Sequence, residues 1–263
     1  MNDMILYAVS DGVATLTLNN PSKFNAFNFA MARALHAAFD RAESDEKVRA
    51  VVITGAGRGF SSGLDLSTPD LGQGVDLGGI LKEEYTPLIL QLISSSKVTI
   101  AALNGPAVGA GASIALACDI VVAARSAYVQ QGFVRIGLIP DVGGTWLLPR
   151  IVGSRRALAL ALTGDRVSAE EAQAMGMIYR VFEDDNFAAE WHAFAGSFAR
   201  GPATAYRLIK EAFRKSNVQD LDAQLRLEAR LQGEAGRTED FQEAVSAFKA
   251  KRPPVFYSAS GQG

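Results

Sequence analysis

Residues 104–119, which read NGPAVGAGASIALACD, combine a glycine-rich turn with a run of small residues. Residues 98–103 before them are apolar and partly β-branched, which predicts a buried strand. The small residues, followed by Ile114 and Leu116, predict a buried helix with closely packed neighbours. A strand, a glycine turn and a helix leave free backbone N–H groups at the helix N-terminus, where the dipole favours negative charge. The stretch therefore indicates either a site for an anionic or developing anionic group, or a tight connection without a ligand.

A second glycine-rich turn favours the first of these alternatives. Residues 50–54, AVVIT, predict another buried strand, and they lead into GAGRGFSSGLD at 55–65. Two such turns can present two N–H groups to one carbonyl oxygen, which is the construction of an oxyanion hole. The glycine spacing is not G-x-G-x-x-G and no long helix follows, which argues against a dinucleotide site. The chain also has no G-x4-G-K-[ST] phosphate loop.

The two turns together resemble those of the crotonase, or enoyl-CoA hydratase/isomerase, superfamily. The resemblance is carried by FSSG-x-D at 60–65, NG-x3-G-x-G at 104–111 and ACD at 117–119, and it extends over about residues 13–256. It implies an α/β fold of ββα units wound into a superhelix over residues 1–182. It also implies a helical C-terminal region over 183–263 that forms homotrimers, often paired into homohexamers. The implied substrate is an acyl-CoA thioester, with no separate cofactor.

Composition excludes several other classes of protein. The net charge of −2 argues against general nucleic-acid binding. Cys118 is the one cysteine, so no disulfide can form within the chain, and a reducing, cytoplasmic location fits. His36 and His192 lie in predicted helices without partner ligands, so we expect no metal site. We also expect no signal peptide and no membrane span, because the N-terminus lacks basic residues and no apolar run reaches 18 residues.

Alternating apolar strands and amphipathic helices predict parallel sheets joined by right-handed crossovers. The expected strands are a hairpin over 5–18, then 48–54, 98–103, 120–124 and 177–182. Helices are expected over 27–42 and 80–95. Two more are expected to begin, one near 143 and one after a capping box at 168–171. Residues 187–250 are expected to be helical, with breaks at 201–202 and 233–237. Residues 68–79 are rich in Gly, Asp and Pro and are expected to form a mobile loop over the site.

The resemblance assigns the chemistry residue by residue. It places the two oxyanion-hole donors at the backbone N–H groups of Leu64 and Ala110. Losing one such donor typically costs roughly 3–4 kcal/mol in the transition state. Family hydratases use two glutamates, and those positions are Ser113 and Phe133 in this chain. Because hydration needs one group to orient water and another to deliver a proton, the sequence argues against ordinary hydratase chemistry.

Asp141, in LIPDVGGTW at 138–146, is the candidate acid–base group. One interpretation is a helix N-cap near Gly143. The other is a carboxylate in an apolar pocket that moves a proton between carbon atoms. The surrounding sequence is similar to the phenylacetate-degradation branch of the superfamily, which includes epoxyphenylacetyl-CoA isomerisation, and the catalytic aspartate of that branch falls on Asp141. Asp119 is expected to be structural.

Further positions match those that contact the substrate and its coenzyme A in the superfamily. Asp65 is expected at the site entrance, where it fixes the turn by hydrogen bonding, and Arg58 is a second candidate beside Lys23 for the phosphates. Phe248 and Lys251 are expected to reach coenzyme A, often in a neighbouring subunit. Trp146, Tyr85 and Phe133 are expected either to form walls of the acyl pocket or to belong to the core. The predicted substrate-binding residues are Lys23, Ala26, Ser62, Asp65, Gly109, Phe133, Trp146, Phe248 and Lys251.

The sequence favours an acyl-CoA isomerase and leaves three alternatives open. These are an enoyl-CoA hydratase of fatty-acid or aromatic-acid degradation, an acyl-CoA hydrolase or dehalogenase with Asp141 as nucleophile, and a non-catalytic acyl-CoA-binding protein.

Overall fold

A six-stranded sheet forms the centre of the computed structural model, which describes residues 3–68 and 74–256. The strand order is β1-β2-β3-β4-β6-β9, in which β1 and β2 form an antiparallel hairpin and the other neighbours are parallel. The strands span Ile5–Ser10, Val13–Leu18, Ala50–Gly55, Val98–Leu103, Ile120–Ala124 and Arg180–Phe182. A smaller sheet, β5-β7-β8, comprises Ala107–Val108, Tyr128–Gln130 and Arg166–Ser168.

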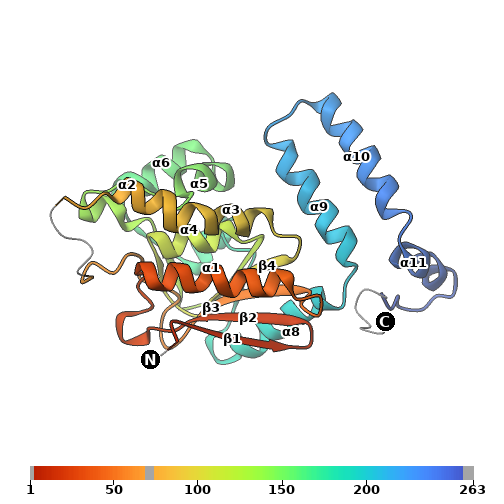
Figure 1. The fold of residues 1–263 in the computed structure, drawn as a ribbon, viewed down its shortest axis with the longest axis horizontal. Helices are drawn as coiled ribbons and strands as arrows, with labels where there is room; N and C mark the ends of the chain where they lie inside the picture. Colours follow the sequence, from red (N-terminus) through yellow and green to blue (C-terminus); the bar gives the residue numbers. More distant parts are fainter. Residues whose placement is uncertain (1–2, 69–73, 257–263) are drawn as a thin grey trace.

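Helices cover both faces of the large sheet, because its parallel strands are apolar on both sides. All six residues of β4 are buried, and Ile53 of β3 pairs with Ala101 of β4 in register. On one face lie α1 (Phe29–Ser44), α3 (Thr86–Ser94) and α4 (Ala110–Ala117). On the other face lies α8 (Phe187–Ala199), whose apolar residues pack on Val52 and Ile100. Figure 1 shows α1 and α8 on opposite sides of the sheet.

The remaining helices complete the α/β body or extend from it. The body also contains α2 (Leu77–Ile80), α5 (Gly144–Val152), α6 (Ser154–Thr163) and α7 (Ala169–Ala174). Beside it lie α9 (Ala203–Ser216), α10 (Leu221–Ala235) and α11 (Glu239–Lys249), which Figure 1 shows in blue. The predicted boundary at residue 182 therefore falls too early for α8, which belongs to the core; the outlying helices begin with α9.

The predicted fold class, an α/β crotonase fold with C-terminal helices, is confirmed, and several element limits differ. The hairpin, the capping box at Ser168 and the break at residues 201–202 are observed. The predicted loop over 68–79 is wrong at its end, because Asp76 caps a helix that begins at Leu77, and its residues 69–73 lie outside the described part of the chain. The last strand begins at Arg180 rather than 177, and α10 runs through Gly233 to Ala235. A further break at 217–220 separates α9 from α10.

Candidate functional site

The first glycine turn is held in place by the buried side chain of Asn25. Its amide donates hydrogen bonds to the carbonyls of Ala56 and Gly59, at 2.9 and 2.8 Å, and its oxygen accepts one from the Asn20 N–H. Asn25 itself has a φ of +55°, a conformation that asparagine tolerates better than most residues. The Ser61 hydroxyl donates to the Asn25 carbonyl at 2.8 Å. Residues distant in sequence thus fix the turn.

Ser61 also joins the first turn to the second. Its hydroxyl accepts a hydrogen bond from the Gly63 N–H, and its carbonyl accepts one from the Val108 N–H. At Gly111 a Cβ atom would lie 2.6 Å from the Ser61 Cβ, so only glycine fits there. Helix α4 can therefore begin directly against the first turn.

Two backbone N–H groups face the space between these turns. Gly63 has a φ of +88°, and a Cβ on it would lie 2.9 Å from the Val108 carbonyl and 3.6 Å from the Ala110 nitrogen. No described residue accepts a hydrogen bond from the N–H of Leu64, nor from that of Ala110 at the first position of α4. Since the first N–H groups of a helix have no intrahelical acceptor, Ala110 is a free donor. Both N–H groups can therefore donate to a bound group.

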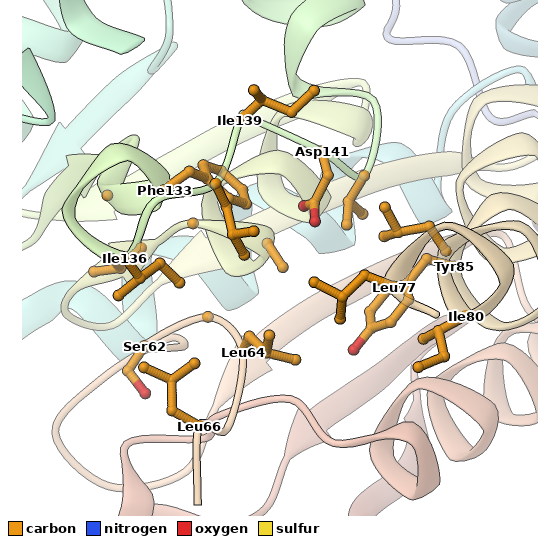
Figure 2. Close-up of a pocket in the computed structure, with 18 of the residues that line it drawn as sticks. Ser62, Leu64, Leu66, Leu77, Ile80, Tyr85, Phe133, Ile136, Ile139 and Asp141 are labelled. Atoms are coloured by element: carbon orange, nitrogen blue, oxygen red, sulfur yellow. The ribbon is translucent and has the colours of Figure 1, made fainter. Parts of the chain in front are cut away.

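A cavity of about 320 Å³ opens beside the two donors. It is bounded by the two turns, by the helical segment over 77–85 and by residues 132–142, as Figure 2 shows. Among the described residues that line it, Asp141 is the one charged residue. The predicted site residues Ser62, Gly109 and Phe133 also line the cavity. The other lining side chains are mostly aliphatic, so the cavity suits an apolar group.

Asp141 has the properties of an acid–base group rather than a helix cap. The N-cap of α5 is Gly143, with no side-chain hydrogen bond, so the capping interpretation is wrong. The buried Oδ1 atom of Asp141 has no hydrogen-bond partner among the described residues. Burial raises the pKa of this carboxyl from its ordinary value to about 6. The carboxylate points into the cavity in Figure 2 and can take up and release a proton near neutral pH.

The backbone beside Asp141 is strained. Val142 is buried and has a φ of +51°, in the left-handed region that β-branched residues avoid. Such a conformation costs about 1–3 kcal/mol and is retained where the surrounding structure enforces it, often at functional sites. The turn is closed by a 2.8 Å hydrogen bond from the Gly144 N–H to the Asp141 carbonyl.

The two positions that hold glutamates in family hydratases carry no carboxylate. Phe133 contributes its ring to the cavity wall. Ser113 is fully buried in α4, and its hydroxyl has no hydrogen-bond partner among the described residues. A Cβ on Gly144 would approach that hydroxyl to 2.8 Å, so the serine lies against the start of α5.

Lys23, Ala26 and Asp65 lie at the rim of the first turn. The Lys23 ammonium is 2.8 Å from Asp65 Oδ2 and 2.7 Å from the Ser67 hydroxyl. Hydrogen bonds from Lys23 and then Ser67 hold the pKa of Asp65 below its usual value, although burial opposes them. Asp65 thus fixes the turn, as expected. Ala26 is buried beside it, and the Arg58 guanidinium lies over the Phe24 ring.

Three predicted substrate contacts lie elsewhere in the single chain. Trp146 is outside the cavity, which corrects the prediction that it forms a wall. Arg150, one helical turn later, lies over its ring at 4.0 Å, and both share the outer face of α5. Phe248 and Lys251 are exposed near the end of α11 and do not line this cavity either.

The remaining candidates have structural environments. Asp119 Oδ2 accepts hydrogen bonds from the Thr99 N–H and hydroxyl and pairs with Lys210 Nζ at 2.6 Å, which agrees with its predicted structural role. Burial raises the pKa of the Cys118 thiol, so it is a poor nucleophile. Within residues 3–68 and 74–256, no group of three or more His, Cys, Asp or Glu side chains is arranged to hold a metal ion.

Across the same described ranges, none of the helices has the length and apolar character needed to span a membrane.

Some positioning residues escaped prediction from the sequence. Asn25 and Ser61 act through a long-range contact with each other. Ser61 lies in the FSSG motif, but the motif does not indicate its partner. Val142 is conspicuous only by its backbone angle. Tyr85, which the sequence offers as a wall of the acyl pocket or as a core residue, lines the cavity.

The fold and the cavity define an α/β protein that presents two backbone donors and one buried carboxylate to the same hollow. A family model described as "Enoyl-CoA hydratase/isomerase" matches residues 8–259, and the chain belongs to this family of enzymes that act on acyl-CoA. The predicted superfamily is therefore confirmed.

Individual relatives carry both names of the family. The chain is 48% identical over 252 residues to a "Probable enoyl-CoA hydratase" of Rhodobacter capsulatus, covering 96% of this chain and 97% of that protein. It is 45% identical over 259 residues to a 1,2-epoxyphenylacetyl-CoA isomerase of Escherichia coli, covering 97% and 99%. A crystal structure of an enoyl-CoA hydratase from Bacillus anthracis matches with a TM-score of 0.91 at 30% identity, covering 97% of this chain and 99% of that one. Relatives of nearly equal identity thus bear hydratase and isomerase names.

Proposed function

We propose that this enzyme is an acyl-CoA isomerase in which Asp141 moves a proton and the N–H groups of Leu64 and Ala110 bind the thioester oxygen. The observation that carries the proposal is that Asp141 is the single charged group among the described, largely apolar residues that line the cavity. Its pKa of about 6 allows Asp141 to act as a base at neutral pH and as an acid once protonated.

The proposed double-bond shift balances with these groups alone. The Asp141 carboxylate removes a proton from the carbon between the thioester and the double bond of a 3-enoyl-CoA. The electron pair delocalises into a dienolate, and the two N–H groups stabilise the charge on the thioester oxygen. Protonated Asp141 then returns the proton to the γ-carbon, which gives the 2-enoyl-CoA and restores the carboxylate.

Isomerisation fits the cavity better than hydration does. Hydration requires one group to orient the water and another to deliver a proton. Ser113 and Phe133 occupy the positions of the two hydratase glutamates, so the described residues that line the cavity supply one carboxylate, that of Asp141. The same base and the same donors could act on an alternative substrate, an epoxyphenylacetyl thioester. Its isomerisation is the activity named for the relative that is 45% identical.

A hydratase is the second candidate, because several relatives bear that name. One is a 2,3-dehydroadipyl-CoA hydratase, 36% identical over 244 residues. Its substrate name implies a distal carboxylate, whereas the residues that line this cavity include no cation. Hydrolysis or dehalogenation through an Asp141 ester, and acyl-CoA binding without turnover, are the remaining alternatives.

We further propose that this cytoplasmic enzyme forms a homotrimer or homohexamer. In such an assembly Phe248 and Lys251 reach the coenzyme A bound to a neighbouring subunit. Their exposure at the end of α11, away from the cavity of their own chain, supports this proposal. Lys23 is placed at the rim of the first turn, where a coenzyme A phosphate can compete with Asp65 for its ammonium.

The experiment that tests the proposed reaction uses 3-hexenoyl-CoA carrying deuterium at Cα. A single base that returns the same proton leaves part of the label at Cγ of the 2-hexenoyl-CoA product, as mass spectrometry can detect. Hydration of crotonyl-CoA is measured in parallel. Rapid hydration with no conversion of 3-hexenoyl-CoA would overturn the isomerase proposal in favour of the hydratase.

A further inference from the structure

Tyr85 presents a second polar group to the cavity. Its side chain is 3% exposed and lines the cavity, and its hydroxyl has no hydrogen-bond partner within the described ranges. Figure 2 shows the hydroxyl of Tyr85 and the carboxylate of Asp141 pointing into the cavity from different elements. The ring packs near Phe27, with centroids 6.4 Å apart, and this contact helps to fix the position of the phenol.

The local backbone brings this hydroxyl into the cavity. Between α2 and α3, residues Leu81–Tyr85 form one π-helical turn, closed by the Thr86 N–H on the Leu81 carbonyl. Pro87 has no N–H to continue the regular pattern, and the Thr86 hydroxyl also donates to Leu81, at 3.0 Å. Such a turn changes the direction of the side chains that follow it and recurs at functional sites.

The unpartnered hydroxyl is costly without a ligand. A buried polar group that loses water and gains no hydrogen bond destabilises the folded state, whereas phenylalanine would fill the same space without that cost. Burial, with the nearby charge of Asp141 as a smaller cause, raises the pKa of Tyr85, so the phenol stays neutral and keeps its proton to donate. Because Tyr85 lines the cavity, a bound molecule can supply the acceptor.

We propose that Tyr85 is a specificity residue that donates a hydrogen bond to an oxygen atom carried by the acyl group of the substrate. The acceptor is a hydroxyl, oxo or epoxide oxygen beyond the thioester, since the Leu64 and Ala110 N–H groups already serve the thioester oxygen. The preferred substrates are thus oxygen-bearing acyl-CoA thioesters. This inference rests on the proposed function only in that the cavity binds acyl-CoA; it does not depend on Asp141 being a base.

The test measures dissociation constants by calorimetry for hexanoyl-CoA and for its 3-, 4- and 5-hydroxy derivatives. The variant is Tyr85→Phe, and the matched control is Tyr7→Phe. Tyr7 also has a buried hydroxyl without a partner among the described residues, but it lies on β1, with Arg41 over its ring at 4.0 Å. The two variants therefore remove the same unpartnered hydroxyl, from a buried residue that lines the cavity and from a half-buried residue outside it.

At least one hydroxyhexanoyl-CoA should bind the wild type about fivefold to tenfold more tightly than hexanoyl-CoA. This ratio of dissociation constants corresponds to the net free energy of one hydrogen bond. Tyr85→Phe should abolish that preference, leave hexanoyl-CoA binding within twofold and not lower the melting temperature. Tyr7→Phe should keep the preference. Equal affinity of the wild type for all four ligands, or a preference that survives in Tyr85→Phe, would overturn the inference. A wild type that binds none of them would overturn the proposed function as well, whereas failure of isomerisation alone would leave the inference intact.

Discussion

Replacing Asp141 by asparagine separates catalysis from folding, because the two consequences have opposite signs. Asparagine keeps the size of the side chain but cannot accept a proton as a base. Turnover of 3-hexenoyl-CoA should fall by roughly a hundredfold or more, which is the usual contribution of a general base. Affinity for the thioester should remain, since the backbone donors are unchanged.

The same substitution should stabilise the protein at high pH. Raising the pKa of Asp141 from about 3.9 to about 6 costs at most about 3 kcal/mol at pH 8, at about 1.4 kcal/mol per pH unit. Because the carboxyl is partly open to solvent, a cost of about 1–2 kcal/mol is expected. Asparagine removes that cost, which corresponds to roughly 2–8 °C in melting temperature.

The pH dependence follows from the direction of the shift. Between the unfolded pKa near 4 and the folded pKa near 6, the folded wild type binds more protons than the unfolded chain, so its stability decreases as pH rises through this window. The advantage of Asp141→Asn should therefore be fully present at pH 8 and fall to about a third of that value at pH 4.5. For the wild type, kcat/KM should rise as pH increases through about 6, because the base must be ionised.

The assay compares melting curves at pH 8 and 4.5 with turnover of 3-hexenoyl-CoA, for wild type and variant. Unchanged turnover, or a variant that is less stable than wild type at both pH values, would refute the assignment of Asp141 as a buried base.

Four further predictions concern the turns, the substrate and the assembly. Gly63→Ala should cost roughly 2–4 kcal/mol and weaken thioester binding, because φ is +88° and the new methyl group meets the Val108 carbonyl. Gly137→Ala, at φ +74° and ψ +19° with open space around it, should cost only about 1 kcal/mol in melting experiments. Hydration of crotonyl-CoA should be negligible, and turnover near the diffusional range would reveal a missed acid–base pair. Calorimetry should show acetyl-CoA binding far more tightly than acetate, and equal affinities would contradict a thioester site. Sedimentation at micromolar concentration should give a trimer or hexamer, because Leu221 and Leu225 of α10 are exposed in the single chain; a monomer would count against this.

The sequence predicted the features that depend on local geometry. Glycine turns after apolar strands specify where free N–H groups lie, and Asp141 stands out in an apolar motif. Side-chain direction was harder to predict. Trp146 follows that motif, yet the period of α5 turns its ring outward beside Arg150. Within α10, Leu221 and Leu225 are exposed, whereas Leu231 is 4% exposed, although all three are apolar residues of one helix.

Long-range contacts lie beyond sequence reasoning of this kind. Ser61 reaches Asn25 across 36 residues, and nothing in either neighbourhood predicts the pairing. The direction of Tyr85 depends on a single π-helical turn, which helical periodicity does not reveal. These contacts decide what the cavity can bind, although the fold class follows without them.

The close approach of Ser61 to Gly111 restricts how this site can change during evolution. A side chain larger than hydrogen at 111 meets Ser61, and removing the Ser61 hydroxyl deprives Gly63 of its acceptor. Neither position can vary alone without displacing a donor. Homologues should therefore alter the two together or leave both unchanged, while the cavity wall opposite diversifies freely and supplies new substrate ranges.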